Sequence, residues 1–173
     1  MKNDNNKENI NKENINQKNI NHENIKKLIE DKFAAVIVWD EKNDNVLTVQ
    51  KASLVALMKF LKENSYDFLA DITAVDYKDK FAVVYQLYQF LNSGHLTVRV
   101  ELDHDKPQAE SMCCLWDAAN WLEREILDLM GVEFLNHPDP RRILLNDDFP
   151  GHPLRKDYVH EPSKYQGRRS IRK

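Results

Sequence analysis

Prolines are crowded into one end of this 173-residue chain. Five of the six follow residue 137: Pro138, Pro140, Pro150, Pro153 and Pro162. Proline fixes its φ angle and has no backbone N–H, so helix interiors and central strands exclude it. Regular structure must therefore lie before residue 137. Residues 137–173 are predicted to form a long, irregular, proline- and arginine-rich C-terminal tail.

The other end of the chain is a short-period repeat. Residues 6–25 are four tandem pentads, each ending in isoleucine. A period of five matches neither the helical nor the strand period, so these isoleucines cannot share one face. So few apolar side chains cannot offset the entropy lost on ordering. We predict that residues 1–24 are a disordered, low-complexity extension.

Residues 25–136 are predicted to form one α+β domain, in which helices pack on a mixed or antiparallel sheet. Helical spacing marks residues 25–33, 54–61 (with Ser53 as N-cap) and 118–130, and strand patterns mark residues 34–40, 46–50, 68–75, 81–91 and 96–102. A turn at residues 92–94 joins the last two strands into a hairpin, and apolar residues alternate in the second arm. The order αββαβββα, with its hairpin-like pairs, favours α+β over a doubly wound sheet.

The helix over residues 118–130 carries several charges. A helical wheel places Glu125 inside the apolar arc, where a carboxylate must be paired, protonated or at an interface. Arg124 and Asp128 stand at i, i+4 and are expected to pair. Gly131 supplies a stop. For Glu123, Glu125 and Asp128, structural or interface roles are favoured over a catalytic carboxylate pair, because nothing indicates a substrate pocket.

The tail offers histidines and arginines with no metal-ligand spacing. His137 and His152 are fifteen positions apart and lack cysteine partners, so hydrogen bonds to the backbone are favoured over a metal. Arg141, Arg142 and Arg155 are expected to present planar forks to carboxylates on a neighbouring surface. The tail is therefore predicted to be the main docking surface and to be poorly ordered without its partner.

Several kinds of chemistry are absent from the sequence. Its four glycines are too scattered for a phosphate-binding loop. Cys113 and Cys114 are too few for an iron–sulfur cluster or structural zinc, and we predict buried, reduced thiols. No run of residues has the apolar length of a membrane span or a signal peptide. Catalytic residues, cofactors and metals are thus predicted to be absent.

Two motifs in the stretch from Trp121 to Tyr158 point to a family. The first comprises Glu123, Arg124, Glu125, Asp128, Leu129, Met130, His137, Arg141, Ile143 and Leu144. The second is Gly-His-Pro-Leu-Arg-Lys-Asp-Tyr at residues 151–158. Together they closely resemble the signature of the 30-kDa-type subunit of proton-translocating NADH:quinone oxidoreductase, respiratory complex I. Pro140 and Phe149 depart from the family's usual residues without breaking the pattern.

This resemblance implies a scaffold subunit of the peripheral arm that holds no cofactor of its own. FMN, iron–sulfur clusters and quinone would be bound by partner subunits. The implied partners are the hydrogenase-large-subunit-like quinone-site subunit and the small-subunit-like one that carries the terminal cluster. The implied location is the cytoplasmic or mitochondrial-matrix side of an energy-transducing membrane. The implied interface comprises Glu123, Arg124, Glu125, Asp128, His137, Arg141, Arg142, His152, Arg155, Lys156 and Asp157.

Two alternatives remain open. The signature is shared by equivalent subunits of photosynthetic-type NDH, F420H2 dehydrogenase and membrane-bound hydrogenases. The charge distribution also allows a basic-tailed nucleic-acid-binding module, because residues 137–173 carry nine basic and five acidic side chains. That module is less favoured, since no aromatic–basic platform accompanies the basic residues 164–173.

Overall fold

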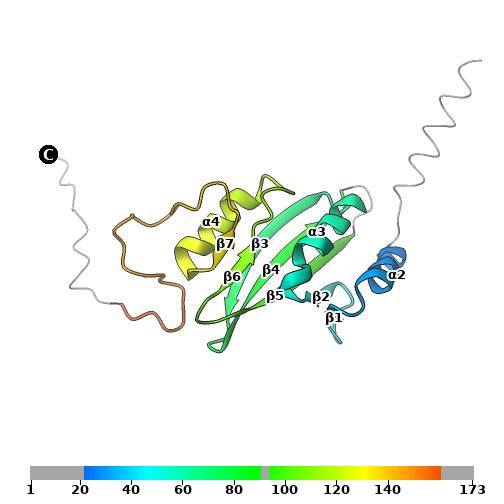
Figure 1. Ribbon diagram of the computed structural model, residues 1–173, viewed down its shortest axis with the longest axis horizontal. Helices are drawn as coiled ribbons and strands as arrows, with labels where there is room; N and C mark the ends of the chain where they lie inside the picture. Colours follow the sequence, from blue (N-terminus) through cyan, green and yellow to red (C-terminus); the bar gives the residue numbers. More distant parts are fainter. Residues whose placement is uncertain (1–21, 91–93, 161–173) are drawn as a thin grey trace, which may run out of the picture.

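The computed structural model describes residues 22–90 and 94–160 (Figure 1). Three α-helices and a five-stranded sheet make up most of this part, and the predicted α+β class and element order are confirmed. The helices are α2 (His22–Phe33), α3 (Leu54–Glu63) and α4 (Ala119–Met130). The strands are β1 (Ile37–Trp39), β2 (Val46–Val49), β3 (Phe68–Asp76), β4 (Lys80–Tyr88), β5 (His95–Asp103), β6 (Gln108–Glu110) and β7 (Glu133–Leu135).

The large sheet has the strand order β1-β2-β5-β4-β3. All neighbouring strands are antiparallel except β2 and β5, which are parallel. The hairpins β1–β2 and β3–β4 follow from short polar turns, and β5 returns against β4 as predicted. The sheet is therefore mixed, with β3 as one edge strand. The short strands β6 and β7, which sequence patterning missed, form a separate parallel pair beside α4.

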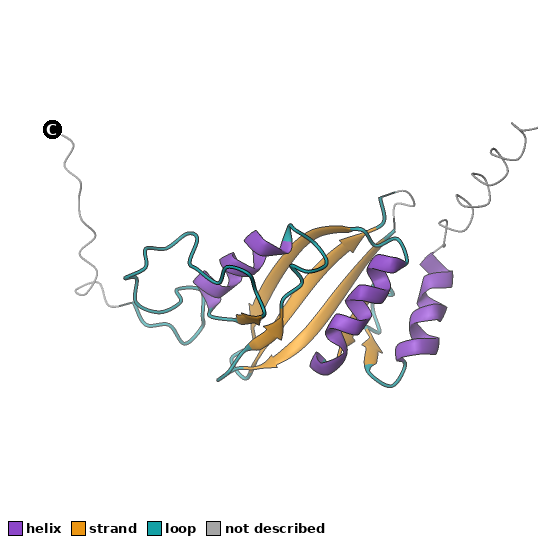
Figure 2. Cartoon of the chain, turned by 45° about the horizontal axis from the view of Figure 1, so that its top comes forward, coloured by secondary structure: helices purple, strands orange, loops and turns teal. Residues whose placement is uncertain are grey.

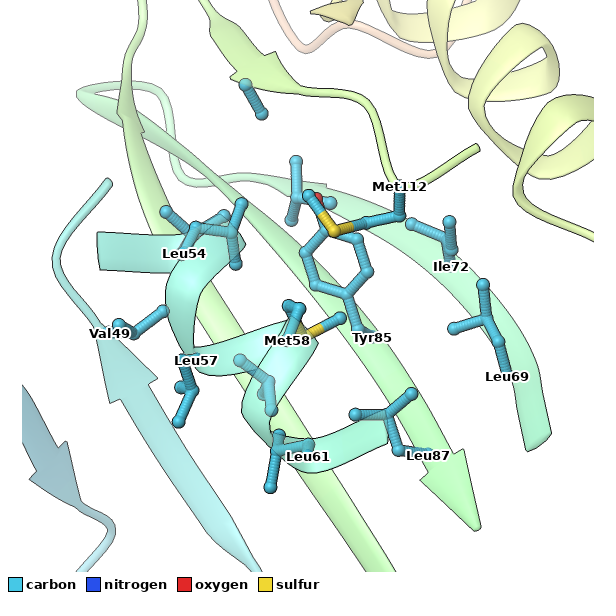
Figure 3. Packing of buried hydrophobic residues seen from close by; sticks show 14 of the residues in the cluster. Val49, Leu54, Leu57, Met58, Leu61, Leu69, Ile72, Tyr85, Leu87 and Met112 are labelled. Carbon is cyan, nitrogen blue, oxygen red and sulfur yellow. The ribbon is translucent and has the colours of Figure 1, made fainter. Parts of the chain in front are cut away.

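Helix α3 crosses one face of the sheet and supplies much of the core (Figure 2). Its residues Leu54, Leu57, Met58 and Leu61 have no solvent exposure. Figure 3 shows Met58 facing Tyr85 of β4, beneath Met112 of the chain that follows β6. Burial of each such aliphatic side chain stabilises the fold by about 1.5–3 kcal/mol. Helix α2 joins this core through Phe33, whose ring lies 5.5 Å from that of Phe60 on α3.

Several boundaries differ from those predicted. The first strand covers only residues 37–39 rather than 34–40, because residues 34–36 form the turn that follows α2. Helix α2 begins at His22, three residues before the predicted start. A 3₁₀ turn at Lys51–Ser53 leads into α3, and the Ser53 side chain makes no capping hydrogen bond. The rest of the pentad repeat, most of the 92–94 turn and residues 161–173 lie outside the described residues.

Helix α4 ends as predicted at Gly131, which adopts a left-handed conformation with φ +72°. The chain then forms β7 and continues as residues 137–160, the orange loop next to α4 in Figure 1. None of the helices in the described part of the chain is long and apolar enough to cross a bilayer.

Candidate functional site

Asp128 on α4 is the centre of the contacts that hold the tail. Its buried carboxylate accepts backbone N–H groups from Ile143, Leu144 and Leu145 at 2.8–3.0 Å. Arg142 donates to the other carboxylate oxygen at 2.8 Å. Burial raises the pKa of Asp128, but the three N–H donors and Arg142 outweigh this and hold the pKa below its usual value. One carboxylate thus fixes the path of a segment that has no secondary structure.

Arg124 binds the same tail through its carbonyls. Its guanidinium donates to Arg141 O at 3.0 Å and Arg142 O at 3.2 Å, and lies 3.4 Å from Asp139. The predicted pair of Arg124 with Asp128 is therefore wrong. Both side chains reach outward to the tail, because its backbone and Asp139 offer closer partners than the helix surface does. Arg124 also covers the Trp121 ring at 5.5 Å.

Glu123, and not Glu125, is the buried carboxylate of α4. Glu123 is 0% exposed and accepts Met112 N–H at 2.7 Å, with the Cys113 thiol 3.7 Å away. Burial raises the pKa of Glu123 to about 7. Glu125 is exposed, so its predicted place in the apolar arc is wrong. The reason is that the chain segment before α4 covers the Glu123 side of the helix.

His137 completes a cluster with the buried Glu123 and the half-buried Cys113. Its Nε2 lies 3.9 Å from Glu123, and the three ligand-type atoms lie within 4.8 Å of one another. However, His137 Nδ1 accepts the N–H of Asp139 at 3.0 Å, so the ring proton lies on Nε2, which contacts Asn120 O at 3.2 Å. A metal on Nε2 would require a proton on Nδ1, facing that N–H donor. The cluster is therefore suited to hydrogen bonding rather than metal binding.

His152 binds backbone in the same manner. Its Nδ1 lies 2.9 Å from Asp128 O, near the end of α4. The nearby backbone N–H of Leu154 donates to Leu129 O at 2.9 Å. The prediction that His137 and His152 hydrogen-bond to backbone groups is confirmed.

The far end of the tail is fastened to the large sheet through Asp76, the last residue of β3. Asp76 accepts the backbone N–H of Lys156 at 2.8 Å and lies 3.3 Å from His104. Burial raises the pKa of Asp76. The N–H groups of Lys156 and Lys78 and the neighbouring cations have a larger, opposite effect, so the pKa lies below its usual value. Sequence reasoning missed Asp76, since no local pattern links residues eighty positions apart.

Arg155 lies over this attachment point. It donates two hydrogen bonds to Asp157, at 2.9 and 3.0 Å, and its guanidinium lies 5.1 Å from the Phe81 ring centre. Arg141 likewise binds Asp139, and Arg142 binds Asp128. The three arginines that were predicted to bind carboxylates on a neighbouring surface therefore bind carboxylates of this chain. The Lys156 side chain stays exposed.

The two cysteines differ from each other. Both are free thiols, as predicted, but Cys114 is exposed, so the predicted burial of both is wrong. Cys113 is half-buried, and burial raises the pKa of its thiol to about 11. Such a thiol stays protonated at neutral pH and is a poor nucleophile.

Comparisons with known proteins agree on one family. Residues 47–164 match the family model described as the respiratory-chain NADH dehydrogenase, 30 Kd subunit. The chain is 44% identical to the C subunit of NADH-quinone oxidoreductase from Geobacter sulfurreducens, over 82% of this chain and 94% of that protein. It is 42% identical to NADH-ubiquinone oxidoreductase subunit 9 of Reclinomonas americana, over 68% of this chain and 60% of that protein.

Solved structures show the same fold. A trypsin-resistant fragment of Nqo5 is 30% identical, with a TM-score of 0.57, over 66% of this chain and 98% of the fragment. A chain of an archaeal respiratory membrane complex, the membrane-bound sulfane sulfur reductase, is 26% identical with a TM-score of 0.69. That match covers 84% of this chain and 93% of the archaeal one.

Proposed function

Since this chain belongs to the family of the 30 kDa subunit of respiratory-chain NADH dehydrogenase, we propose that it is a non-catalytic scaffold subunit of a proton-translocating NADH:quinone oxidoreductase. In this role it holds the quinone-site subunit in the peripheral arm. Electrons pass from NADH through FMN and iron–sulfur clusters in other subunits to quinone. The chain attaches to the membrane through its partners, on the cytoplasmic or mitochondrial-matrix side.

The observation that supports this proposal is that residues of the family signature hold the tail in place. Asp128, Arg124 and His152 hold the tail against α4. Arg124 also lines a cavity of about 200 Å³ together with Glu123 and His137, and both of these side chains are hydrogen-bonded to the backbone of this chain. A family signature whose residues hold the chain in one fixed conformation is suited to a scaffold subunit, against which other subunits assemble. The implied partners are the quinone-site subunit and the terminal-cluster subunit.

An affinity tag on this chain tests the proposal. After mild detergent extraction, the tagged chain should co-purify with the flavin, cluster and quinone-site subunits, and the complex should reduce quinone with NADH. Deletion of the chain should abolish this activity in membranes, and the wild-type copy should restore it. Purification of the chain alone, or a flavin or iron bound stoichiometrically to the isolated chain, would contradict the proposal.

The likeness to the archaeal sulfane sulfur reductase favours a second candidate, namely the equivalent subunit of a related respiratory complex. The same purification separates the two. Oxidation of NADH by the tagged complex supports the first candidate, whereas activity with another electron donor and none with NADH supports the second.

A further inference from the structure

A groove lies between the edge strand β3 and α4, and the tail lines it without filling it. It encloses about 170 Å³ and is lined by Ile72 of β3, by Leu129 and Met130 of α4 and by Leu154 of the tail. The Leu154 side chain is 58% exposed, and Trp121, two turns before Leu129 on α4, is 61% exposed. The groove is too small for a typical cofactor or drug-sized ligand. It is suited to side chains from another protein.

The charges at this groove have a single sign. Asp71 of β3 and Glu125 of α4 both line it and both are exposed. No ion pair or hydrogen bond within the described residues engages either side chain. The neighbouring cation, Arg124, is turned away to the tail carbonyls and Asp139. Two unpaired carboxylates beside apolar side chains repel an acidic occupant and attract a cation.

We propose that this groove, defined by Asp71, Ile72, Glu125, Leu129, Met130 and Leu154, binds a segment of a neighbouring subunit that places an arginine or lysine between Asp71 and Glu125 and apolar side chains against Leu129 and Leu154. The inference rests on the proposed function, because it assigns a contact within that complex. Among the three signature carboxylates of α4, Glu125 then faces outward, while Glu123 and Asp128 face inward. Aromatic and aliphatic anchors around a desolvated charge pair are typical of the energetically dominant part of an interface.

Charge reversal of Glu125 tests this assignment in the whole chain. Glu125→Arg should leave the melting temperature of the isolated chain unchanged, because the side chain is exposed and unpaired. It should reduce the affinity for the rest of the complex on the order of thirtyfold or more, the effect of breaking a buried interfacial charge pair. Glu125→Gln should reduce the affinity less. The matched control is Glu41→Arg, an exposed carboxylate in the turn between β1 and β2.

A photo-crosslinking amino acid at Leu154 identifies the occupant in the assembled complex. A crosslinked peptide from another subunit, with a lysine or arginine beside apolar residues, supports the proposal. A crosslink to a second copy, to residues 161–173 of this chain or to nothing overturns it, as does normal assembly of Glu125→Arg. If the wild-type chain is absent from the complex altogether, the proposed function itself fails.

Discussion

Glu123 and Glu125 are two positions apart on α4 and meet opposite environments. Glu123 is enclosed by residues 111–113 and His137, and it accepts hydrogen bonds from the N–H of Met112 and the thiol of Cys113. Glu125 lies in solvent at the rim of the groove. The pKa of a carboxyl rises with burial and falls with hydrogen bonds to its charged form. At Glu123 burial prevails, so this residue is partly protonated at neutral pH.

The raised pKa of Glu123 predicts a pH-dependent stability. In the unfolded chain Glu123 loses its proton near pH 4.5, and in the folded chain near pH 7. Between these values the folded state binds more protons, so the Glu123 contribution lowers the free energy of unfolding as pH rises, by roughly 3 kcal/mol in all. Urea unfolding at pH 5 and pH 7.5 should show a smaller fall for Glu123→Gln than for the wild type. Glu125→Gln is the control and should follow the wild type. An identical fall in Glu123→Gln would contradict the assignment.

At the scale of elements, α4 and the tail fold as one unit. The helix contributes the side chains of Asp128 and Arg124. The tail contributes backbone N–H and C=O groups, which cannot pair within a helix or sheet because prolines interrupt such structure. The end of α4 meets the tail at Gly131, where an added Cβ would lie 2.6 Å from the His152 ring. The glycine is therefore needed both for its left-handed backbone and for the close approach of the tail.

Substitution of Gly131 separates these two requirements. Gly131→Ala should lower the free energy of unfolding by roughly 2–4 kcal/mol, since it adds a clash with His152 to the cost of positive φ. The matched control is Gly151→Ala, which has φ +76° but a Cβ 3.2 Å from the nearest Tyr158 atom. This control should cost mainly the backbone term, roughly 1–2 kcal/mol, because the Tyr158 ring has to move by only a few tenths of an ångström. Both free energies of unfolding are measured by urea denaturation. An equal decrease in the two variants would show that the His152 ring does not clash with a Cβ at position 131.

At the scale of the whole molecule, the tail is attached to two different elements. One is α4, and the other is the Asp76 end of the sheet, where the Lys156 N–H and Arg155 meet Asp76, Phe81 and Asp157. Residues 142–156 are thereby fastened to both α4 and the sheet by contacts within this chain. A partner that meets such a preformed surface loses less conformational entropy than one that orders a free tail.

Reversal of Arg155 should release the sheet end of this attachment. Arg155→Glu removes the fork to Asp157 and the contact with Phe81, and places a carboxylate beside Asp76. Amide hydrogen exchange in residues 152–158 should become about tenfold faster or more, while the strands keep their protection. Arg141→Glu, whose side chain is 79% exposed in the wild type, should leave exchange in residues 152–158 unchanged. Unchanged exchange in Arg155→Glu would show that Arg155 is not needed to hold residues 152–158.

The sequence by itself determined the features that depend on local pattern. Alternation in residues 96–102 predicted which face of β5 is buried, helical spacing predicted α3 and α4, and Gly131 predicted where α4 ends. These succeed because strand and helix periods act on neighbouring residues. The two signature motifs likewise predicted the family.

Only the tertiary structure decided which charged groups meet. The helical wheel cannot tell which segment will cover a given side of α4, so it assigned burial to Glu125 rather than Glu123. The link from Asp76 to Lys156 and the parallel pairing of β2 with β5 join residues far apart in the chain. Such contacts depend on how the elements pack in three dimensions, because a hydrogen bond or an ion pair requires two groups within a few ångströms, whatever their separation along the sequence.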